Sequence, residues 1–310
     1  MEENLPLVSI LIPAYNQVHY LEKALISVLS QTYTNIEIII CDDSTNNKVE
    51  KLIKNYIQHN KNIKYYNNGG PLGEKGALNM QRCFDVSRGE YINYLMHDDL
   101  FFPNKIKSML KYLISNEDVT LVTSHKRFIN ENGEFFDDTK PLLDKNCKIN
   151  GENLGLYVLN SMTNVIGEPT TVMFRKKDID DKILDYKGWS ARGFGDIAIW
   201  LKLLSKGHAV YIREPLSCFR LHYEQNTYDP IIELWGVIDW YYFTTNSYLN
   251  KSFIKTKKQY LIILEKWFNK YISKIKLAQN YSKSEDEDLY KVKKDLYCCY
   301  NEAIKTLLKL

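Results

Sequence analysis

Four aspartates stand in two adjacent pairs, Asp42–Asp43 and Asp98–Asp99, and each pair follows an apolar run typical of a buried strand. In open α/β sheets, ligands bind at the carboxyl ends of the strands, so these pairs are expected to meet at one edge. Carboxylates gathered in one place repel one another unless a cation or hydrogen-bond donors compensate. A hard divalent ion that also holds diphosphate oxygens would supply that compensation. The alternative is that each pair caps the following helix or turn.

The elements that would position these aspartates alternate between strand and helix. Buried strands are expected over residues 8–12, 36–41, 63–66, 91–96 and 119–123. Helical spacing of apolar residues appears between them, and Pro103 opens a further helix. This alternation predicts an α/β fold with a doubly wound, mostly parallel, Rossmann-like sheet.

The middle of the chain is less regular, and the last third is helical. Asn130–Gly133 predicts a hairpin turn, and strands are expected over 170–175 and 209–212, on either side of a helix over 196–206. From residue 231 there is almost no Gly or Pro. We therefore expect a catalytic domain over 1–228 and an α-helical extension over 229–310.

Composition excludes several classes of function. The net charge of +3 is too small to predict nucleic-acid binding. No apolar stretch approaches the ~20 residues that span a bilayer, and Met1–Leu5 does not resemble a signal peptide. The six cysteines form no metal-type pairs and are expected to be reduced. We expect a cytoplasmic protein. Its C-terminal helices could dock an acceptor, a partner protein or the inner face of the membrane, and the sequence does not decide among these.

Several segments, in this order, resemble the motifs of family 2 glycosyltransferases. They are Val8–Asn16, Leu29–Tyr33, Ile40–Ser44, Gly89–Asp99, Gly193–Asp196 and Glu214–His222. Together they cover about the first 225 residues. The resemblance implies a GT-A fold and an inverting, nucleotide-sugar-dependent enzyme.

The resemblance also implies roles for residues that bind the nucleotide. Pro13 and Tyr15 would line the donor site, with Tyr15 stacking on the base. Asp43 would accept a hydrogen bond from a uracil imide, and Asp42 would support that loop. Uracil is therefore the expected base.

Other motifs match the sugar-diphosphate and the reaction. Lys75, Gly76 and Asn79 match the donor-binding region of the family. Asp98 would lie near the ribose or the sugar, Asp99 would contact Mn²⁺ or Mg²⁺, and His222 would touch the metal or the diphosphate. Asp196 matches the general base that deprotonates the acceptor hydroxyl.

The chain departs from the family pattern at two places. Met96 stands where many relatives carry the first acid of the metal motif, and Gly195 precedes Asp196 where many carry Glu. Two neighbours of the predicted base have open roles. Trp189 would pack against a sugar ring or in the core, and Arg192 would grip acceptor or phosphate oxygens or form a surface ion pair.

The resulting hypothesis is transfer of a hexose or N-acetylhexosamine from a UDP-sugar to an acceptor hydroxyl. The acceptor would be a protein, such as a flagellin, or a growing surface polysaccharide. The alternatives are a non-catalytic nucleotide-sugar-binding module and a nucleotidyltransferase. The latter would need a Gly-rich basic loop near the N-terminus, which Pro13–Asn16 does not supply.

Overall fold

The computed structural model describes residues 5–137, 139–223, 225, 229–280 and 287–309. The strands are β1 (Val8–Ala14), β2 (Ile36–Asp42), β3 (Ile63–Asn67), β4 (Tyr91–Tyr94), β5 (Leu100–Phe101), β6 (Val119–Ile129), β7 (Phe135–Asp137), β8 (Cys147–Ile149), β9 (Val172–Arg175), β10 (Asp185–Tyr186), β11 (Trp189–Ser190) and β12 (His208–Arg220). The α-helices are α1 (Val18–Leu29), α2 (Lys48–Ile57), α3 (Ala77–Val86), α4 (Lys105–Ser115), α5 (Gly151–Ser161), α6 (Gly195–Leu204), α7 (Pro230–Leu249), α8 (Lys257–Asn280) and α9 (Glu287–Leu308). Short 3₁₀ helices are η1 (Glu74–Gly76), η2 (Pro169–Thr171) and η3 (Lys176–Asp178).

The chain forms two compact units that are discontinuous in sequence. The first contains Met1–Gly151, Ile166–Ile183 and Lys206–His222, and the second contains Glu152–Val165, Leu184–Ser205 and Tyr223–Leu310. The division into 1–228 and 229–310 stays a prediction, and residue 228 itself lies outside the described residues.

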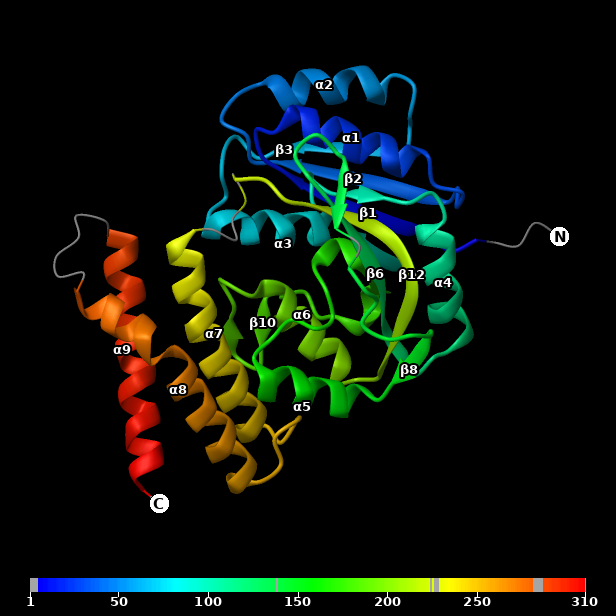
Figure 1. Ribbon diagram of the computed structural model, residues 1–310. Coiled ribbons are helices and arrows are strands. Elements are labelled where there is room, and N and C mark those ends of the chain that lie inside the picture. The colour runs from blue at the N-terminus through cyan, green and yellow to red at the C-terminus, as the bar shows by residue number, and fades with distance from the viewer. Residues whose placement is uncertain (1–4, 138, 224, 226–228, 281–286, 310) are drawn as a thin grey trace. The chain divides into compact units, whose positions relative to one another are not determined.

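The first unit is built on one large mixed sheet. Its strand order is β3-β2-β1-β4-β9-β6-β12-β5, with β7 paired to β6 and β8 to β12. Strands β1, β2, β3 and β4 are parallel, as are β6 and β12. Helices α1 and α2 lie on one face of β1–β3 and α3 lies on the other (Figure 1). The sheet is therefore mostly parallel and doubly wound, as the alternating pattern predicts.

Strand β9 interrupts the parallel order. It pairs antiparallel to β4 on one side and to β6 on the other. It enters the sheet after a long excursion of the chain, so no local pattern shows where it inserts. The expected hairpin is present, because β6 and β7 pair antiparallel and Gly133 N donates to Asn130 O at 3.0 Å.

Alternate residues of the central strands build the core. Val8, Ile10 and Ile12 of β1 are fully buried in a cluster with apolar residues of α1, α2 and α4. Leu11 is equally buried but points to the opposite face of the sheet. Burial on both faces explains why the sequence of β1 is a continuous apolar run.

The second unit is mainly helical and rich in aromatic contacts. Helices α7, α8 and α9 pack against one another in pairs. Trp267 of α8 is fully buried, lies 5.2 Å from the ring of Tyr241 and 4.9 Å from that of Tyr300, and donates to Val237 O at 2.8 Å. Among the described residues, no helix is long and apolar enough to cross a membrane.

Candidate active site

The first acidic pair lies at the end of β2, where Asp42 stabilises the surrounding chain through hydrogen bonds. Asp42 is 1% exposed, and its Oδ1 accepts from Ser44 N at 2.9 Å. Its Oδ2 accepts from the Tyr65 hydroxyl of β3 at 2.6 Å. Burial and this hydrogen bond to a carboxylate raise the pKa of Tyr65. Both oxygens of Asp42 therefore hold the chain that surrounds the site.

Asp43 is also buried but retains acceptor capacity. Its Oδ1 accepts from Asn68 Nδ2 at 2.8 Å and its Oδ2 from Leu72 N at 3.2 Å. Burial raises the pKa of Asp43; those hydrogen bonds oppose the shift, and the charge of Asp42 adds to it. An ionised carboxylate has about four acceptor positions, so two remain after these contacts.

Asn79 ties the ends of β1 and β2 together. It is 2% exposed, and its Nδ2 donates to Cys41 O at 2.9 Å and to Ala14 O at 3.4 Å. Its Oδ1 accepts from Asn68 at 3.0 Å. Asn79 thus fixes the edge on which Asp43 stands, and its predicted contact with the donor stays a prediction.

Tyr15 presents an open ring just beyond β1. It is 46% exposed, which leaves a face available for stacking.

His97 contacts two residues at the end of β1 and just beyond it. The carbonyl of Pro13 lies 3.2 Å from His97 Nδ1, while His97 Nε2 lies 2.9 Å from Gln17 Oε1. The His97 ring therefore links the second acidic segment to the end of β1.

Lys75 and Gly76 form a strained turn before α3. Glu74 and Lys75 have φ of 51° and 50°, and Gly76, the N-cap of α3, has φ of 94°. Non-glycine residues adopt the left-handed region at a cost of order 1–3 kcal/mol each, and such strain clusters at ligand-binding sites. This turn is one part of the predicted donor region with unusual backbone, and Asn16, with φ of 55°, is another.

Asp99 is fully buried, and protein donors meet both of its oxygens. Oδ1 accepts from Arg220 N at 3.0 Å, and Oδ2 makes a short hydrogen bond with the Thr170 hydroxyl. Burial and the neighbouring charge of Asp98 hold the pKa of Asp99 well above its ordinary value. Asp99 therefore joins the loop after β4 to β12 and η2.

Asp98, by contrast, is partly exposed and lies against His222. Its Oδ2 is 3.0 Å from His222 Nε2, and the two side chains are 15% and 4% exposed. Burial opposes ionisation of Asp98, but the hydrogen bond from His222 and the nearby charges of His97 and His222 outweigh it and lower its pKa. An ionised carboxylate and an imidazole thus lie together.

Arg220 is a structural residue to which the sequence reading gave no role. It is fully buried; its Nε donates to Asp98 O at 2.7 Å and its Nη1 to Asn130 O at 2.9 Å. Its guanidinium lies 4.6 Å from the ring centre of Tyr20. The signal was an arginine inside the apolar run of β12, two residues before His222.

The donor set fits a divalent ion shared with a substrate. No group of three or more His, Cys, Asp or Glu suited to a metal occurs within the described part of the chain. Asp98 and His222 alone supply one carboxylate and one imidazole. Mg²⁺-type ions are commonly held by one or two carboxylates plus substrate phosphates, so two protein ligands are compatible with such a site.

The predicted base, Asp196, lies in the second unit, in the first turn of α6. Its Oδ2 accepts from Asn164 Nδ2 at 2.8 Å, and its Oδ1 accepts from Ile197 N at 2.8 Å. Its catalytic role stays a prediction.

The two residues with open roles have partners within the second unit. Trp189 stacks on Tyr242 with ring centres 3.7 Å apart and donates from Nε1 to Asp239 at 2.8 Å. Arg192 lies 4.0 Å from Asp295 in a loose, partly exposed ion pair. Sequence reading also gave no role to Asp239, a single carboxylate in an otherwise apolar part of α7.

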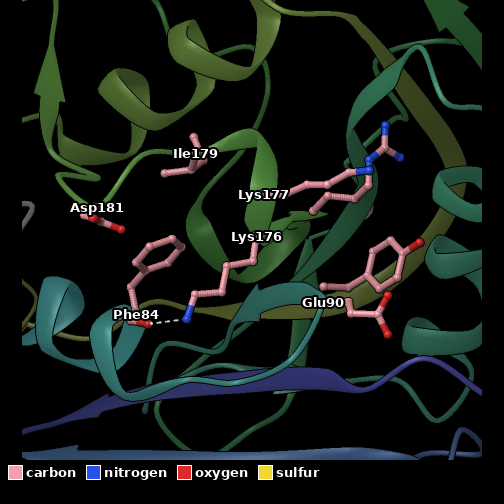
Figure 2. A pocket seen from close by; sticks show the side chains of 8 residues that line it. Phe84, Glu90, Lys176, Lys177, Ile179 and Asp181 are labelled. Carbon is pink, nitrogen blue, oxygen red and sulfur yellow. Dashed lines mark hydrogen bonds between the residues drawn. The ribbon is translucent and has the colours of Figure 1, made fainter.

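A cavity of about 450 Å³ in the first unit lies apart from these residues. Figure 2 shows its lining, where Phe84, Ile179, Lys176 and Lys177 come from the end of α3 and from the chain that follows β9. Lys176 Nζ donates to Phe84 O at 3.1 Å and so caps α3. None of the predicted site residues lines this cavity.

The sheet and its edge define the class of protein. A mostly parallel sheet with α-helices on both faces carries two acidic pairs at its strand ends, and this is a GT-A fold. The chain belongs to the family described as glycosyl transferase family 2, whose sequence model matches residues 9–182.

Sequence relatives carry the same general description. An uncharacterized glycosyltransferase of Rickettsia typhi is 30% identical over 231 residues, which is 72% of this chain and 66% of the relative. One of Methanocaldococcus jannaschii is 34% identical over 142 residues, covering 45% of this chain and 48% of the relative. The chain thus spans about two thirds and about half of these relatives.

A solved structure shares the fold over nearly the whole chain. The crystal structure of S. aureus TarS 1–349 in complex with UDP-GlcNAc gives a TM-score of 0.64 at 14% identity. The match covers 98% of this chain and 84% of that chain. At this identity the likeness establishes the fold alone.

Proposed function

We propose that this chain transfers a hexose or N-acetylhexosamine from a UDP-sugar to an acceptor hydroxyl with inversion at the anomeric carbon. The observation that carries the proposal is the His97 ring, which links the Asp98 segment to the end of β1, beside Tyr15 and Asp43. Base, sugar and diphosphate recognition would then share one strand edge. The TarS complex with UDP-GlcNAc, on the same fold, supports a nucleotide-sugar donor.

The first unit would bind the donor. The exposed ring of Tyr15 would stack on uracil, and the remaining acceptor positions of Asp43 would receive its imide N–H. Asp98 and His222 would hold a Mn²⁺ or Mg²⁺ ion; when bound, such an ion supplies positive charge to the leaving diphosphate. We propose Asp98 rather than Asp99 for this role, because Asp99 is 0% exposed whereas the Asp98 side chain is 15% exposed.

Asp196 would act as the general base. As the acceptor oxygen attacks the anomeric carbon opposite the diphosphate, its proton would pass to an oxygen of the Asp196 carboxylate. Attack from that side inverts the anomeric centre, and no covalent enzyme intermediate is needed. The acceptor would be a protein hydroxyl, as in flagellin modification, or the end of a surface polysaccharide, with the C-terminal helices docking the acceptor, a partner protein or a membrane surface.

Calorimetric titration with UDP, GDP and CDP, each with Mn²⁺ and with EDTA, tests the proposed donor. We expect binding that is selective for UDP and stronger with Mn²⁺. Absence of binding by any nucleotide would contradict both the proposed transferase and a nucleotide-sugar-binding module. Selective binding without turnover of UDP-glucose, UDP-galactose or UDP-N-acetylglucosamine would favour a binding module.

The role of Asp196 is tested by Asp196→Asn. Loss of the base should lower turnover of the UDP-sugar by about 10²–10⁴-fold and leave donor affinity nearly unchanged. Asp185→Asn is the matched control, because Asp185 accepts from Gly188 N in the β10–β11 turn of the same unit. Weakened donor binding with preserved turnover would remove Asp196 from the role of base.

A further inference from the structure

One buried carboxylate of α7 collects hydrogen bonds from the loop that leads to Asp196. Asp239 is 0% exposed. It accepts from Trp189 Nε1 at 2.8 Å, from Gly193 N at 2.8 Å, from Phe194 N at 2.8 Å and from Arg192 N at 3.2 Å. Successive backbone N–H groups that converge in this way form a binding site for an anion, which Asp239 fills.

The same loop also meets α7 through two glycines. A Cβ atom added to Gly193 would lie 2.7 Å from Ile232 O and closer still to Gly236 N. A Cβ atom added to Gly236 would lie 2.5 Å from the Phe194 ring. The loop backbone therefore rests directly on the helix backbone, with no side chain between them.

This double attachment ends at the residue before α6. Phe194 is the N-cap of α6, and Asp196 is the second residue of that helix. Phe194 O accepts from Ala198 N at 3.2 Å, so the attachment passes into the first helical turn. Only Gly195 separates the anchored residue from Asp196.

We propose that Asp239 is a positioning residue that, together with Gly236, fixes the Trp189–Phe194 loop on α7 and thereby sets the place of the Asp196 carboxylate. This assignment rests on the proposed function, in which Asp196 is the base. A displacement of a catalytic group by about 1 Å can reduce turnover by about 10²-fold. Loss of the anchor at Phe194, two residues before Asp196, is therefore expected to reduce turnover.

A carboxylate suits this position better than an amide would. Every partner of Asp239 is an N–H donor, and Asn would offer one oxygen while turning its own N–H groups toward the loop amides. Hydrogen bonds to an ionised acceptor are about twice as strong as neutral ones. Burial raises the pKa of Asp239 to about 6 against the opposing effect of these donors, so the carboxylate remains ionised at neutral pH.

The test compares Asp239→Asn with Ser247→Ala in the full chain. Ser247 is a matched control, because it is also buried on α7 and its Oγ lies 2.8 Å from the Tyr186 hydroxyl of β10 instead of meeting a loop amide. The measurements are kcat and donor KM for hydrolysis of UDP-glucose, UDP-galactose and UDP-N-acetylglucosamine, in which water is the acceptor and UDP is released. Amide hydrogen exchange over residues 189–196 is a second readout.

We expect Asp239→Asn to lower kcat by about 10²-fold at nearly constant donor KM, and to speed exchange over residues 189–196. Ser247→Ala should change neither quantity. If Asp239→Asn does not fold, Trp189→Phe takes its place, because it removes one hydrogen-bond donor to Asp239 and keeps an aromatic ring stacked on Tyr242. A larger loss of kcat in Trp189→Phe than in Ser247→Ala would then support the positioning role of Asp239.

The contrary results are distinct. Wild-type protein that turns over none of the UDP-sugars refutes the proposed function, and the catalytic assignment of Asp239 falls with it. Suppose instead that the wild-type protein is active and that folded Asp239→Asn, or Trp189→Phe in its place, matches Ser247→Ala in kcat and in amide exchange. That result overturns the positioning role of Asp239 and leaves the proposed function standing.

Discussion

Asp98 and Asp99 are neighbours in sequence but have different surroundings. Asp99 is enclosed by Arg220 N and the Thr170 hydroxyl, and its carboxyl has a raised pKa. Asp98 lies at the surface of the same loop beside His222, with a lowered pKa. Of the two carboxyl groups, Asp98 has the lower pKa and the more exposed side chain, which are the properties that a cation ligand would need.

The substitutions Asp98→Asn and Asp99→Asn separate these roles. Asp98→Asn should weaken Mn²⁺-dependent UDP binding by roughly tenfold or more, about 1.4 kcal/mol, because a neutral amide is a poor ligand for a hard cation. Asp99→Asn should retain binding, because an amide can still accept from Arg220 N and donate to the Thr170 hydroxyl. Calorimetry with Mn²⁺ and with EDTA measures both. The reverse ranking would return the metal contact to Asp99.

At the level of elements, a carboxylate network joins the amino ends of two strands to the loop before β4. Glu37 of β2 accepts from Ser9 Oγ at 2.6 Å, Arg88 N at 2.6 Å and Gly89 N at 3.1 Å. A Cβ atom on Gly89 would lie 2.5 Å from Ser9 Oγ, so the loop approaches β1 closely. This network lies at the sheet edge opposite to the acidic pairs, and its loss should affect stability rather than catalysis.

Glu37→Gln should lower the free energy of unfolding by about 1–3 kcal/mol at neutral pH, because buried donors would lose their charged acceptor. Burial opposes ionisation, but the hydrogen bonds from Ser9 and Arg88 prevail and lower the pKa of Glu37 from 4.5. The contribution of the Glu37 carboxylate to the free energy of unfolding is therefore fully present above its ordinary pKa of 4.5. It is lost as the pH falls from there through the lowered pKa of the folded protein.

Urea unfolding at neutral and acidic pH measures this difference. The gap between wild type and Glu37→Gln should narrow on acidification. Glu50→Gln serves as control, since Glu50 forms an exposed pair with Lys54 on α2 and such pairs contribute about 0.3–0.5 kcal/mol. Equal losses in the two variants would refute the buried network as a source of stability.

At the level of the whole molecule, the second unit draws together three separate segments. The ring centres of Tyr186 and Phe243 lie 5.7 Å apart, and those of Phe194 and Trp240 lie 5.4 Å apart. Residues 184–205 therefore share a core with α7, although some 25 residues or more of sequence separate them. Helix α6, which carries Asp196, depends on this core.

A chain that ends at residue 228 should consequently lose cooperative unfolding, because β10, β11 and α6 would keep none of their contacts with α7. Near-ultraviolet circular dichroism and a thermal melt would reveal the loss. A cooperative melt of this truncated chain would instead support the domain boundary predicted from sequence.

Local patterns predicted much of the first unit. Continuous apolar runs marked β1, β2 and β4 because these strands are buried on both faces, and an acidic pair marked the end of β2 and the loop after β4. The insertion of β9 was missed, because strand neighbours in a sheet depend on tertiary packing. Asp239 was missed because one carboxylate in an apolar helix gives no sign of the amides that it meets.

The contact between Gly193 and Gly236 constrains how this protein can be diversified. Any side chain on one backbone collides with the other segment, so neither position can vary alone. A chimera that takes the loop from one homologue and helix α7 from another would place mismatched surfaces together. Recombination libraries should therefore exchange residues 189–196 and 232–243 together.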